Sequence, residues 1–384
     1  MIYLDNAATS YPAQSGDLND HLWSNWVNPS TVSTKGKEVR LMMEDARKKF
    51  ANYIGANSEE IYFTSCGSES NNWAIKGFLS ANDNCLSLIV SEVEHPSVYE
   101  VARYYEAKNE LRVYYCPVDK DGIYRLEDLE IILQTIKEKD NDDIPLVSMM
   151  YVNNETGVIN DINAVANLVH KYGGVFHSDM VQALTHIPIN VKELDVDMAS
   201  FSFCKIGLPR GLGALYIKEG INIDPLIHGG GQERGLRSGT ENTMCISMLA
   251  ETVDYYLENK NFIDEYINKL NTILINEIIS HSPVQVVKNG EDTIPNIVSF
   301  RFQGIDASRL RDLLDLKGII VSTGSACKSG SNEPSRILKA MALSDQEAKE
   351  TIRISFNTSL GESNIRMFVR KLVECIKNLQ MLEE

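Results

Sequence analysis

Short apolar runs alternate with segments of helical periodicity over roughly the first 220 residues of this chain. Parallel strands need a long crossover, usually a helix, whereas two antiparallel strands can be joined by a tight turn. The alternation therefore predicts βαβ units and an α/β fold, with a mostly parallel seven-stranded sheet and helices on both faces. The strand-like runs are residues 61–64, 86–91, 112–118, 145–152, 174–179, 197–203 and 213–218.

Beyond about residue 255 the pattern changes. Long amphipathic segments at 262–279 and 365–379 flank strand-like runs at 296–302 and 351–356. This texture predicts a second, smaller α+β domain.

Composition narrows the classes of function. The chain has 384 residues, of which 43% are hydrophobic and 23% charged, as in an ordinary globular enzyme large enough for two domains. A net charge of −16 argues against a nucleic-acid partner, because such proteins present a basic face. No run approaches the roughly 18 apolar residues of a membrane span, and the chain passes from Met1 directly into IYLDNAATS, so we expect neither a membrane anchor nor a signal peptide.

Cysteine usage points to a reducing compartment. Seven cysteines is an odd number, and no pair has the CxxC or histidine spacing of a zinc site. We therefore expect a cytoplasmic protein without a bound metal, in which most thiols are small core residues.

Asp179 and Lys205 end two of the apolar runs and are the first candidates for chemistry. Pyridoxal 5′-phosphate needs a lysine amine for its Schiff base and a carboxylate that keeps its pyridine nitrogen protonated. The pair suits that cofactor. An aspartate at a strand end can instead serve only as a helix cap or turn former.

Other polar residues follow predicted strands. Residues 63–72, FTSCGSESNN, form a strand, a Gly/Ser turn and a helix, which predicts a phosphate cup unless Ser68 is an ordinary N-cap. His95 follows the run at 86–91, where it is either a group that stacks on a flat cofactor or a surface histidine. Asn154 lies in a polar turn and Gln182 one helical turn after Asp179, so an amide of either could reach the same ligand.

Two Gly-rich loops complete the candidates. Residues 228–242, HGGGQERGLRSGTEN, combine five glycines with two arginines, which suits contact with a phosphate or carboxylate, including one across a subunit boundary. Residues 322–335 set Cys327 beside Lys328 among small residues, and nearby positive charge favours the reactive thiolate. An incidental loop cysteine is the alternative.

Together these segments resemble the cysteine desulfurases of the class V aminotransferase family, in the branch that serves nitrogen fixation and iron–sulfur scaffolds. The resemblance runs from the N-terminus to about residue 356. It implies a fold-type-I pyridoxal-phosphate enzyme and an obligate homodimer, with a large domain at 15–255 and a small domain formed by 1–14 and 256–384 that carries the Cys327 loop. The motifs that carry it, in order, are YLDNAAT, NPS, SESNN, EHPSV, NNETG, HSDMVQA, the Lys205 segment, HGGGQERGLRSGTEN, and GSAC followed by EPSRIL.

The resemblance implies roles for individual residues around the cofactor. Lys205 matches the Schiff-base lysine and Asp179 the partner of the pyridine nitrogen. His95 matches the histidine that stacks on the ring, and Gln182 the residue that bonds its phenolic oxygen. The phosphate-cup positions correspond to Gly67, Ser68 and Ser202, with Thr240 reaching in from the other subunit.

Further matches concern the substrate and the sulfur. Arg353 matches the arginine that forks onto the substrate carboxylate, and Asn154 the asparagine near that carboxylate and the cofactor. Cys327 matches the cysteine that becomes a persulfide. The implied activity converts L-cysteine to L-alanine and passes the sulfur to an acceptor protein, which the sequence does not name.

The chain also departs from the family pattern. Cys204 stands where a histidine normally reaches the cofactor phosphate, and a thiol is a weak donor. Cys66 replaces a residue that is usually small, and ISFNTS after position 353 replaces the usual ISLG or FSLG. A related class V lyase or transaminase, for example one acting on selenocysteine, and a degenerate cofactor-binding relay subunit therefore remain alternatives.

Overall fold

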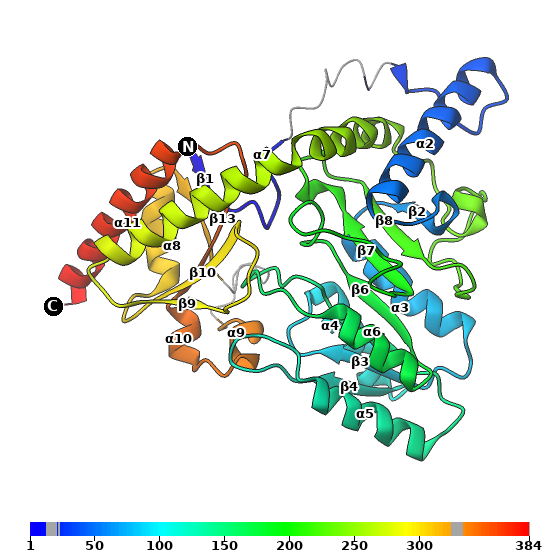
Figure 1. Cartoon of the computed structure of the whole chain (residues 1–384), viewed down its shortest axis with the longest axis horizontal. Helices are drawn as coiled ribbons and strands as arrows, with labels where there is room; N and C mark the ends of the chain where they lie inside the picture. The colour runs from blue at the N-terminus through cyan, green and yellow to red at the C-terminus, as the bar shows by residue number, and fades with distance from the viewer. Residues whose placement is uncertain (13–20, 22–23, 324–332, 384) are drawn as a thin grey trace.

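The computed structural model describes residues 1–12, 21, 24–323 and 333–383. Two regions, each built on its own sheet, lie side by side and are joined along one edge by the long helix α7 (Thr243–His281) (Figure 1). The N- and C-terminal ends of the chain both lie in the region with the smaller sheet (Figure 1).

The larger region contains a seven-stranded sheet, as the alternation of strand and helix signals predicts. Four of its neighbouring pairs are parallel, and β8 runs antiparallel to both of its neighbours. The prediction of a mostly parallel sheet is therefore confirmed. The strands, in spatial order, are β2 (Ile61–Thr64), β8 (Gly213–Ile217), β7 (Met198–Ser202), β6 (Val175–Asp179), β5 (Leu146–Ser148), β3 (Ser87–Ser91) and β4 (Arg112–Cys116).

Successive residues of a strand point to opposite faces of a sheet. Both faces of this sheet present apolar side chains, and helices cover both. In β3, Ile89 joins one apolar core, whereas Leu88 and Val90 join another. The first core is covered by α2 (Thr34–Tyr53), α5 (Leu126–Lys139), α6 (Ile162–Lys171) and the first half of α7, and the second by α3 (Gly67–Ala81) and α4 (Pro96–Lys108). A short 3-10 turn, η1 (Ser58–Glu60), leads into β2.

The smaller region is built on a four-stranded antiparallel sheet that α8 (Ala307–Leu316), α11 (Glu362–Glu383) and the second half of α7 cover. The first residues of the chain also belong here, because β1 (Ile2–Tyr3) pairs in parallel with β11 (Ile319–Ile320). The sheet order is β12 (Ser322–Thr323), β13 (Thr351–Ser355), β10 (Ile297–Phe302) and β9 (Val286–Asn289).

Helix α7 has 39 residues and contributes to both regions. Its first part, including Leu249 and Val253, packs in the core of the seven-stranded sheet, and its later part, including Leu270 and Ile278, packs under the four-stranded sheet. The segment predicted as a helix at 262–279 is thus only its second half. The proposed domain boundary after residue 255 falls inside this helix, and the domain division itself remains a prediction.

Two short helices that precede β13 pack against the larger region. α9 (Arg336–Ala340) and α10 (Asp345–Lys349) follow in sequence within the proposed small domain. Their apolar residues Ile337, Leu338 and Ala348 nevertheless pack in the core of the seven-stranded sheet. Across the described ranges, no helix combines the length and apolarity that a bilayer crossing requires.

Candidate active site

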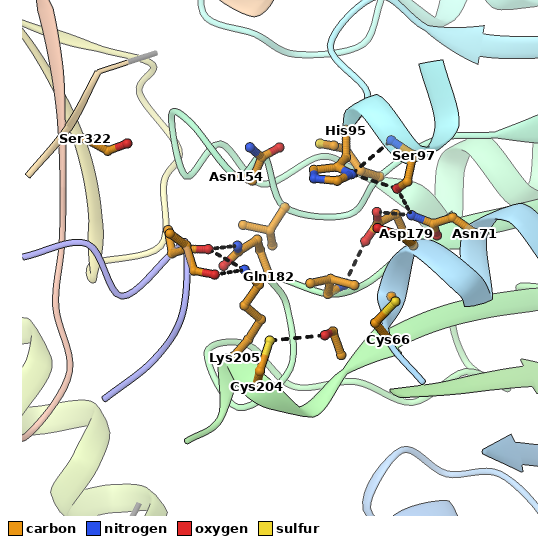
Figure 2. Close-up of a pocket in the computed structure, with 18 of the residues that line it drawn as sticks. Cys66, Asn71, His95, Ser97, Asn154, Asp179, Gln182, Cys204, Lys205 and Ser322 are labelled. Atoms are coloured by element: carbon orange, nitrogen blue, oxygen red, sulfur yellow. Dashed lines mark hydrogen bonds between the residues drawn. The ribbon is translucent and has the colours of Figure 1, made fainter. Parts of the chain in front are cut away.

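A cavity of about 420 Å³ opens at the carboxyl ends of β6 and β7. In open α/β sheets, ligands bind at this end of the strands. Both regions of the molecule line it, because Asp5 and Arg353 come from the smaller region and most other side chains from the larger. Figure 2 shows Ser322 of the smaller region on one side of the cavity and His95 and Asp179 of the larger region on the other. The sequence-predicted residues that line it are Gly67, Ser68, His95, Asn154, Asp179, Gln182, Ser202, Cys204, Lys205 and Arg353.

Asp179 is the last residue of β6 and only 6% exposed. Its Oδ1 atom accepts a hydrogen bond from the backbone N–H of Val181 at 2.9 Å, and Oδ2 accepts from Nδ2 of Asn71 at 2.7 Å. The carboxylate therefore does form a local turn, as the alternative interpretation expects. It also lines the cavity, and its role toward a cofactor stays a prediction.

The sequence predicts that Lys205 ends a strand. In the structure it instead ends a 3-10 turn, η2 (Phe203–Lys205), that follows β7. Its Nζ atom donates to the carbonyl oxygens of Ala7 at 2.7 Å and Ala8 at 2.6 Å. Burial lowers the pKa of the Lys205 amine, and the positive charge of Arg353 acts in the same direction. Such an amine loses its proton more readily than a surface lysine.

His95 is the N-cap residue of α4 and lies partly buried against the cavity. Its Nδ1 atom accepts from the backbone N–H of Ser97 at 3.1 Å and lies 2.7 Å from Oγ of the same serine. A neutral ring therefore carries its proton on Nε2. Burial lowers the pKa of His95, which favours this neutral form.

The first turn of α3 forms one end of the cavity. The N-cap is Cys66, not Ser68, and its side chain makes no capping hydrogen bond, so the expectation of Ser68 as an ordinary N-cap is wrong. A Cβ atom on Gly67 would lie 2.7 Å from Cγ2 of Val181 and 3.2 Å from Cβ of Ser202, so the approach of helix to strand requires glycine there. The backbone N–H groups of a first helical turn suit an anion.

Sulfur and hydroxyl groups meet beside this turn. Sγ of Cys204 lies 3.4 Å from Oγ of Ser202 (Figure 2). Cys66 lines the same part of the cavity. Two thiols therefore line this end of the cavity.

Arg353 connects the smaller region to the cavity. Nη2 pairs with Oδ1 of Asp5 at 2.6 Å, and Nη1 donates to the carbonyl oxygen of Asn154 at 2.8 Å. Among the described residues, Nε of Arg353 and Oδ1 of Asn154 are buried without a hydrogen-bond partner. Gln182 donates from Nε2 to the carbonyl oxygen of Ala7 at 2.9 Å, the same acceptor that Lys205 uses.

Ion pairs within this chain hold the Gly-rich loop at 228–242 in place. Glu233, in the 3-10 turn η3 (Glu233–Gly235), forms a buried double hydrogen bond with Arg47 at 2.7 and 2.9 Å, and Arg237 pairs with Glu69 at 2.7 Å. Arg234, the other arginine of the loop, donates to the carbonyl oxygen of Ile61. Both arginines of the loop therefore serve internal contacts, and neither lines the cavity. Thr240 is exposed and does not line that cavity.

Sequence reasoning missed four residues of the site. Asn71 and Ser97 join Asp179 to His95, while Asp5 and Ala7 bind Arg353 and Lys205. Asn71 lies in the segment predicted as a phosphate cup, where polar residues suggest helix capping. Asp5 and Ala7 lie in the motif YLDNAAT, but only the fold brings them to the cavity. Cys327 lies outside the described residues.

The model of the family described as Aminotransferase class-V matches residues 2–368. The chain belongs to the class V aminotransferase family. A cysteine desulfurase IscS from Clostridium botulinum is 36% identical over 383 residues, which cover 98% of this chain and 94% of that relative. A solved NifS-like protein superposes with a TM-score of 0.88 at 34% identity, covering 98% of this chain and 99% of the other.

A further neighbour of this class V chain was solved with a ligand. It is SspA in complex with cysteine, with a TM-score of 0.79 and 29% identity over 93% of this chain and 99% of that one. The expected α/β architecture of a pyridoxal-phosphate enzyme and the expected family are thereby confirmed.

Proposed function

We propose that this chain is a pyridoxal 5′-phosphate-dependent L-cysteine desulfurase that releases L-alanine and transfers the sulfur to Cys327. The observation that carries the proposal is the convergence of Asp179, at the end of β6, and Lys205, one short turn beyond the neighbouring strand β7, on one cavity. Relatives named cysteine desulfurase match nearly the whole chain. A selenocysteine-specific lyase and an inactive relay subunit are not favoured by these relatives.

The cavity residues fit the cofactor. The carboxylate of Asp179 is held by two donors and suits a protonated pyridine nitrogen. Lys205 offers an amine for covalent attachment, and the uncapped first turn of α3 with Ser68 and Ser202 offers donors to a phosphate. The close approach of Gly67 to Val181 leaves that turn free of side-chain bulk. When bound, the group supplies an electron-accepting ring that stabilises negative charge at the Cα atom of the substrate.

Proton movement is assigned to Lys205. Burial lowers the pKa of its amine, so that a neutral Nζ is available to take the Cα proton of the substrate. His95 lines the same cavity with its Nε2–H, and we assign it to stacking and to holding a proton there. Gln182, whose amide already donates 2.9 Å to Ala7, is assigned to the phenolic oxygen of the cofactor.

Substrate binding is assigned to Arg353 and Asn154. A planar guanidinium matches a carboxylate with two parallel hydrogen bonds. The buried, unpartnered Nε of Arg353 is a donor that such a carboxylate would satisfy. Oδ1 of Asn154, also buried without a partner, can only accept, so it suits a donor of the ligand such as the amino group. In the structure the same guanidinium pairs with Asp5, so the substrate carboxylate competes with that contact.

Sulfur transfer requires one nucleophile. The Cys327 thiolate attacks the sulfur of the substrate, the carbon–sulfur bond breaks, and a sulfur–sulfur bond forms. The former Cβ atom takes a proton, so that L-cysteine and a thiol become L-alanine and a persulfide without an external oxidant.

The remaining proposals concern partners. Thr240 is exposed on its own chain, which is compatible with a contact to the cofactor phosphate of a second copy in a homodimer. An acceptor protein, in iron–sulfur cluster assembly or tRNA thiolation, then takes the sulfur from Cys327. The cytoplasm is the compartment that the cysteine pattern predicts.

The direct test is incubation of the purified, cofactor-loaded protein with L-cysteine. We expect yellow absorbance before substrate, stoichiometric release of alanine, and a persulfide on Cys327 by mass spectrometry. Cys327→Ala should lose sulfur transfer, whereas Cys375→Ala, which alters a buried thiol of α11, should keep it. Full sulfur transfer by Cys327→Ala would refute the proposal.

A further inference from the structure

A chain of side-chain hydrogen bonds runs along one side of the cavity. Nδ2 of Asn71 donates to Oδ2 of Asp179 at 2.7 Å and also contacts Oγ of Ser97 at 2.8 Å. Oγ of Ser97 lies 2.7 Å from Nδ1 of His95 (Figure 2). The chain thus connects two residues proposed to contact the cofactor ring, and the roles assigned above use neither Asn71 nor Ser97.

Chemistry fixes the direction of every bond in the chain. An ionised carboxylate can only accept, so the amide nitrogen of Asn71 must face Asp179. Its second hydrogen then goes to Oγ of Ser97. Because the backbone N–H of Ser97 already donates to Nδ1 of His95, that nitrogen is an acceptor, and the Ser97 hydroxyl must donate to it as well.

Burying the side-chain amide of Asn71 costs the protein stability. Asn71 is 1% exposed, and its Oδ1 atom is buried without a partner among the described residues. An unpaired buried acceptor costs about 1–3 kcal/mol of stability. The two donors on Nδ2 are what distinguishes this asparagine from an apolar residue that would fill the same space.

We propose that Asn71 is a positioning residue that, through the Ser97 hydroxyl, couples Asp179 to His95 and keeps Nδ1 of His95 an acceptor. The proposal rests on the proposed function for its meaning in catalysis. With Asn71 present, its amide fills one of the two acceptor sites of the Ser97 hydroxyl, which favours pointing the hydroxyl hydrogen at His95. Without it, the hydroxyl is free to turn and accept from a protonated Nδ1, so that charging His95 becomes easier.

The surroundings of His95 define what else influences its titration. The charged or titratable groups that face it are Asp179 from β6, Lys205 from η2 and Arg336 from α9, with Glu94 next to it in the chain. Replacing Ser97 touches none of these groups, whereas replacing Asn71 also removes one donor from the Asp179 carboxylate, so the test uses the shift that both variants share. A shift in the titration of His95 in those variants therefore reports the hydrogen-bond chain.

The test is an NMR titration of His95 in the full-length chain, with and without pyridoxal 5′-phosphate. The chain has seven histidines, and His95→Gln assigns the signal. Asn71→Ala and Ser97→Ala should each raise the midpoint of His95 by about 0.5 to 1 pH unit, the equivalent of one hydrogen bond. Because the chain acts in series, the double variant should shift His95 no further than Ser97→Ala alone.

Asn72→Ala is the matched control. Nδ2 of Asn72 donates to the carbonyl oxygens of Ser68 and Ser97, so it also ties α3 to α4, but it does not reach the Ser97 hydroxyl. We expect it to leave the titration of His95 unchanged. If Asn71→Ala does not fold, Ser97→Ala and Ser97→Thr carry the test, since only threonine keeps the hydroxyl.

Three results would overturn the proposal: an unchanged His95 midpoint in Asn71→Ala, additive shifts in the double variant, or an equal shift in Asn72→Ala. With the cofactor bound, Asn71→Ala should also lower kcat about tenfold with less change in KM, because it removes one buried hydrogen bond. The titration of the cofactor-free chain does not depend on desulfurase activity. If the wild type releases no alanine from cysteine, the proposed function fails, whatever the titration shows.

Discussion

The two sides of the cavity are built in different ways. One side, which we call the sheet wall, consists of Asn71, His95, Ser97 and Asp179 and comes entirely from the larger region. The other, the mixed wall, consists of Asp5, Ala7, Ala8, Asn154 and Arg353 and combines both regions. Lys205 and Gln182 lie between the two walls, and both donate to the carbonyl oxygen of Ala7 (Figure 2).

The difference lies in where polar groups find their partners. On the sheet wall, side chains bind one another, and the carboxylate of Asp179 has two donors independent of any ligand. On the mixed wall, Arg353 binds Asp5 and a backbone carbonyl, while two buried polar atoms lack partners, compared with one, Oδ1 of Asn71, on the sheet wall. The sheet wall is therefore preorganised, whereas the mixed wall exchanges internal contacts for ligand contacts.

The largest expected effect comes from the residue between the walls. Lys205→Ala should reduce alanine release at least about a thousandfold, because no second lysine lines the cavity in the described residues. Alanine release and the yellow absorbance of the bound cofactor measure this. Lys192→Ala, at an exposed lysine that donates to Asn57, is the control. Wild-type turnover in Lys205→Ala would show that Lys205 does not perform the reaction.

Arg353→Lys tests the mixed wall. Loss of the planar fork should raise KM for L-cysteine about 10- to 100-fold with a smaller change in kcat. Arg301→Lys is the matched control, because Arg301 lies on the neighbouring strand β10 and pairs with Glu347. An unchanged KM would mean that Arg353 serves only to join the two regions through Asp5.

Two buried carboxyl groups, one next to each wall, predict how the stability of the protein depends on pH. Burial raises the pKa of Glu94, next to the sheet wall, to about 8, although Ser91 and Met150 donate to it. Burial also raises the pKa of Glu155, next to the mixed wall, to about 7, with Ser335 opposing the rise. Each folded-state pKa lies above the unfolded value, so the folded state binds the extra proton. The free energy of unfolding therefore falls as pH rises from about 4.5 to the folded-state pKa.

Glu94→Gln should remove this pH dependence, because glutamine imitates the protonated acid. We expect a gain relative to wild type of about 3 kcal/mol between about pH 5.5 and pH 8.5, measured by denaturant unfolding. In Glu155→Gln the gain should level off about one pH unit lower. Parallel stability curves for wild type and Glu94→Gln would contradict the assignment of Glu94 as a buried neutral acid.

The smallest effect is expected at the phosphate end. Cys204→His should tighten retention of pyridoxal 5′-phosphate about threefold, because imidazole is a better hydrogen-bond donor than a thiol. Equilibrium dialysis of the cofactor measures it, and Cys204→Ser, a donor with shorter reach, is the control. Weaker retention in Cys204→His would show that the thiol itself is required beside Ser202.

The sequence predicted the sheet wall better than the mixed wall. Asp179, His95 and Gln182 each follow an apolar run, and a parallel sheet brings such positions to one edge. Asn71 escaped notice because its role depends on the rotation of α3 against β6. The partners of Arg353 escaped notice because Asp5 lies 348 residues away along the chain.

The alternation of apolar runs and helical periods determined the sheet, its helical layers and the end at which a ligand binds, because burial follows local periodicity. The ordered motifs identified the family and the residues that reach the cavity. Only the tertiary structure decided what those residues touch: the coupling of Asp179 to His95, the carbonyl partners of Lys205 and the docking of Asp5 on Arg353. These contacts join segments far apart in the chain, and their geometry depends on how helices and sheets pack rather than on any local sequence signal.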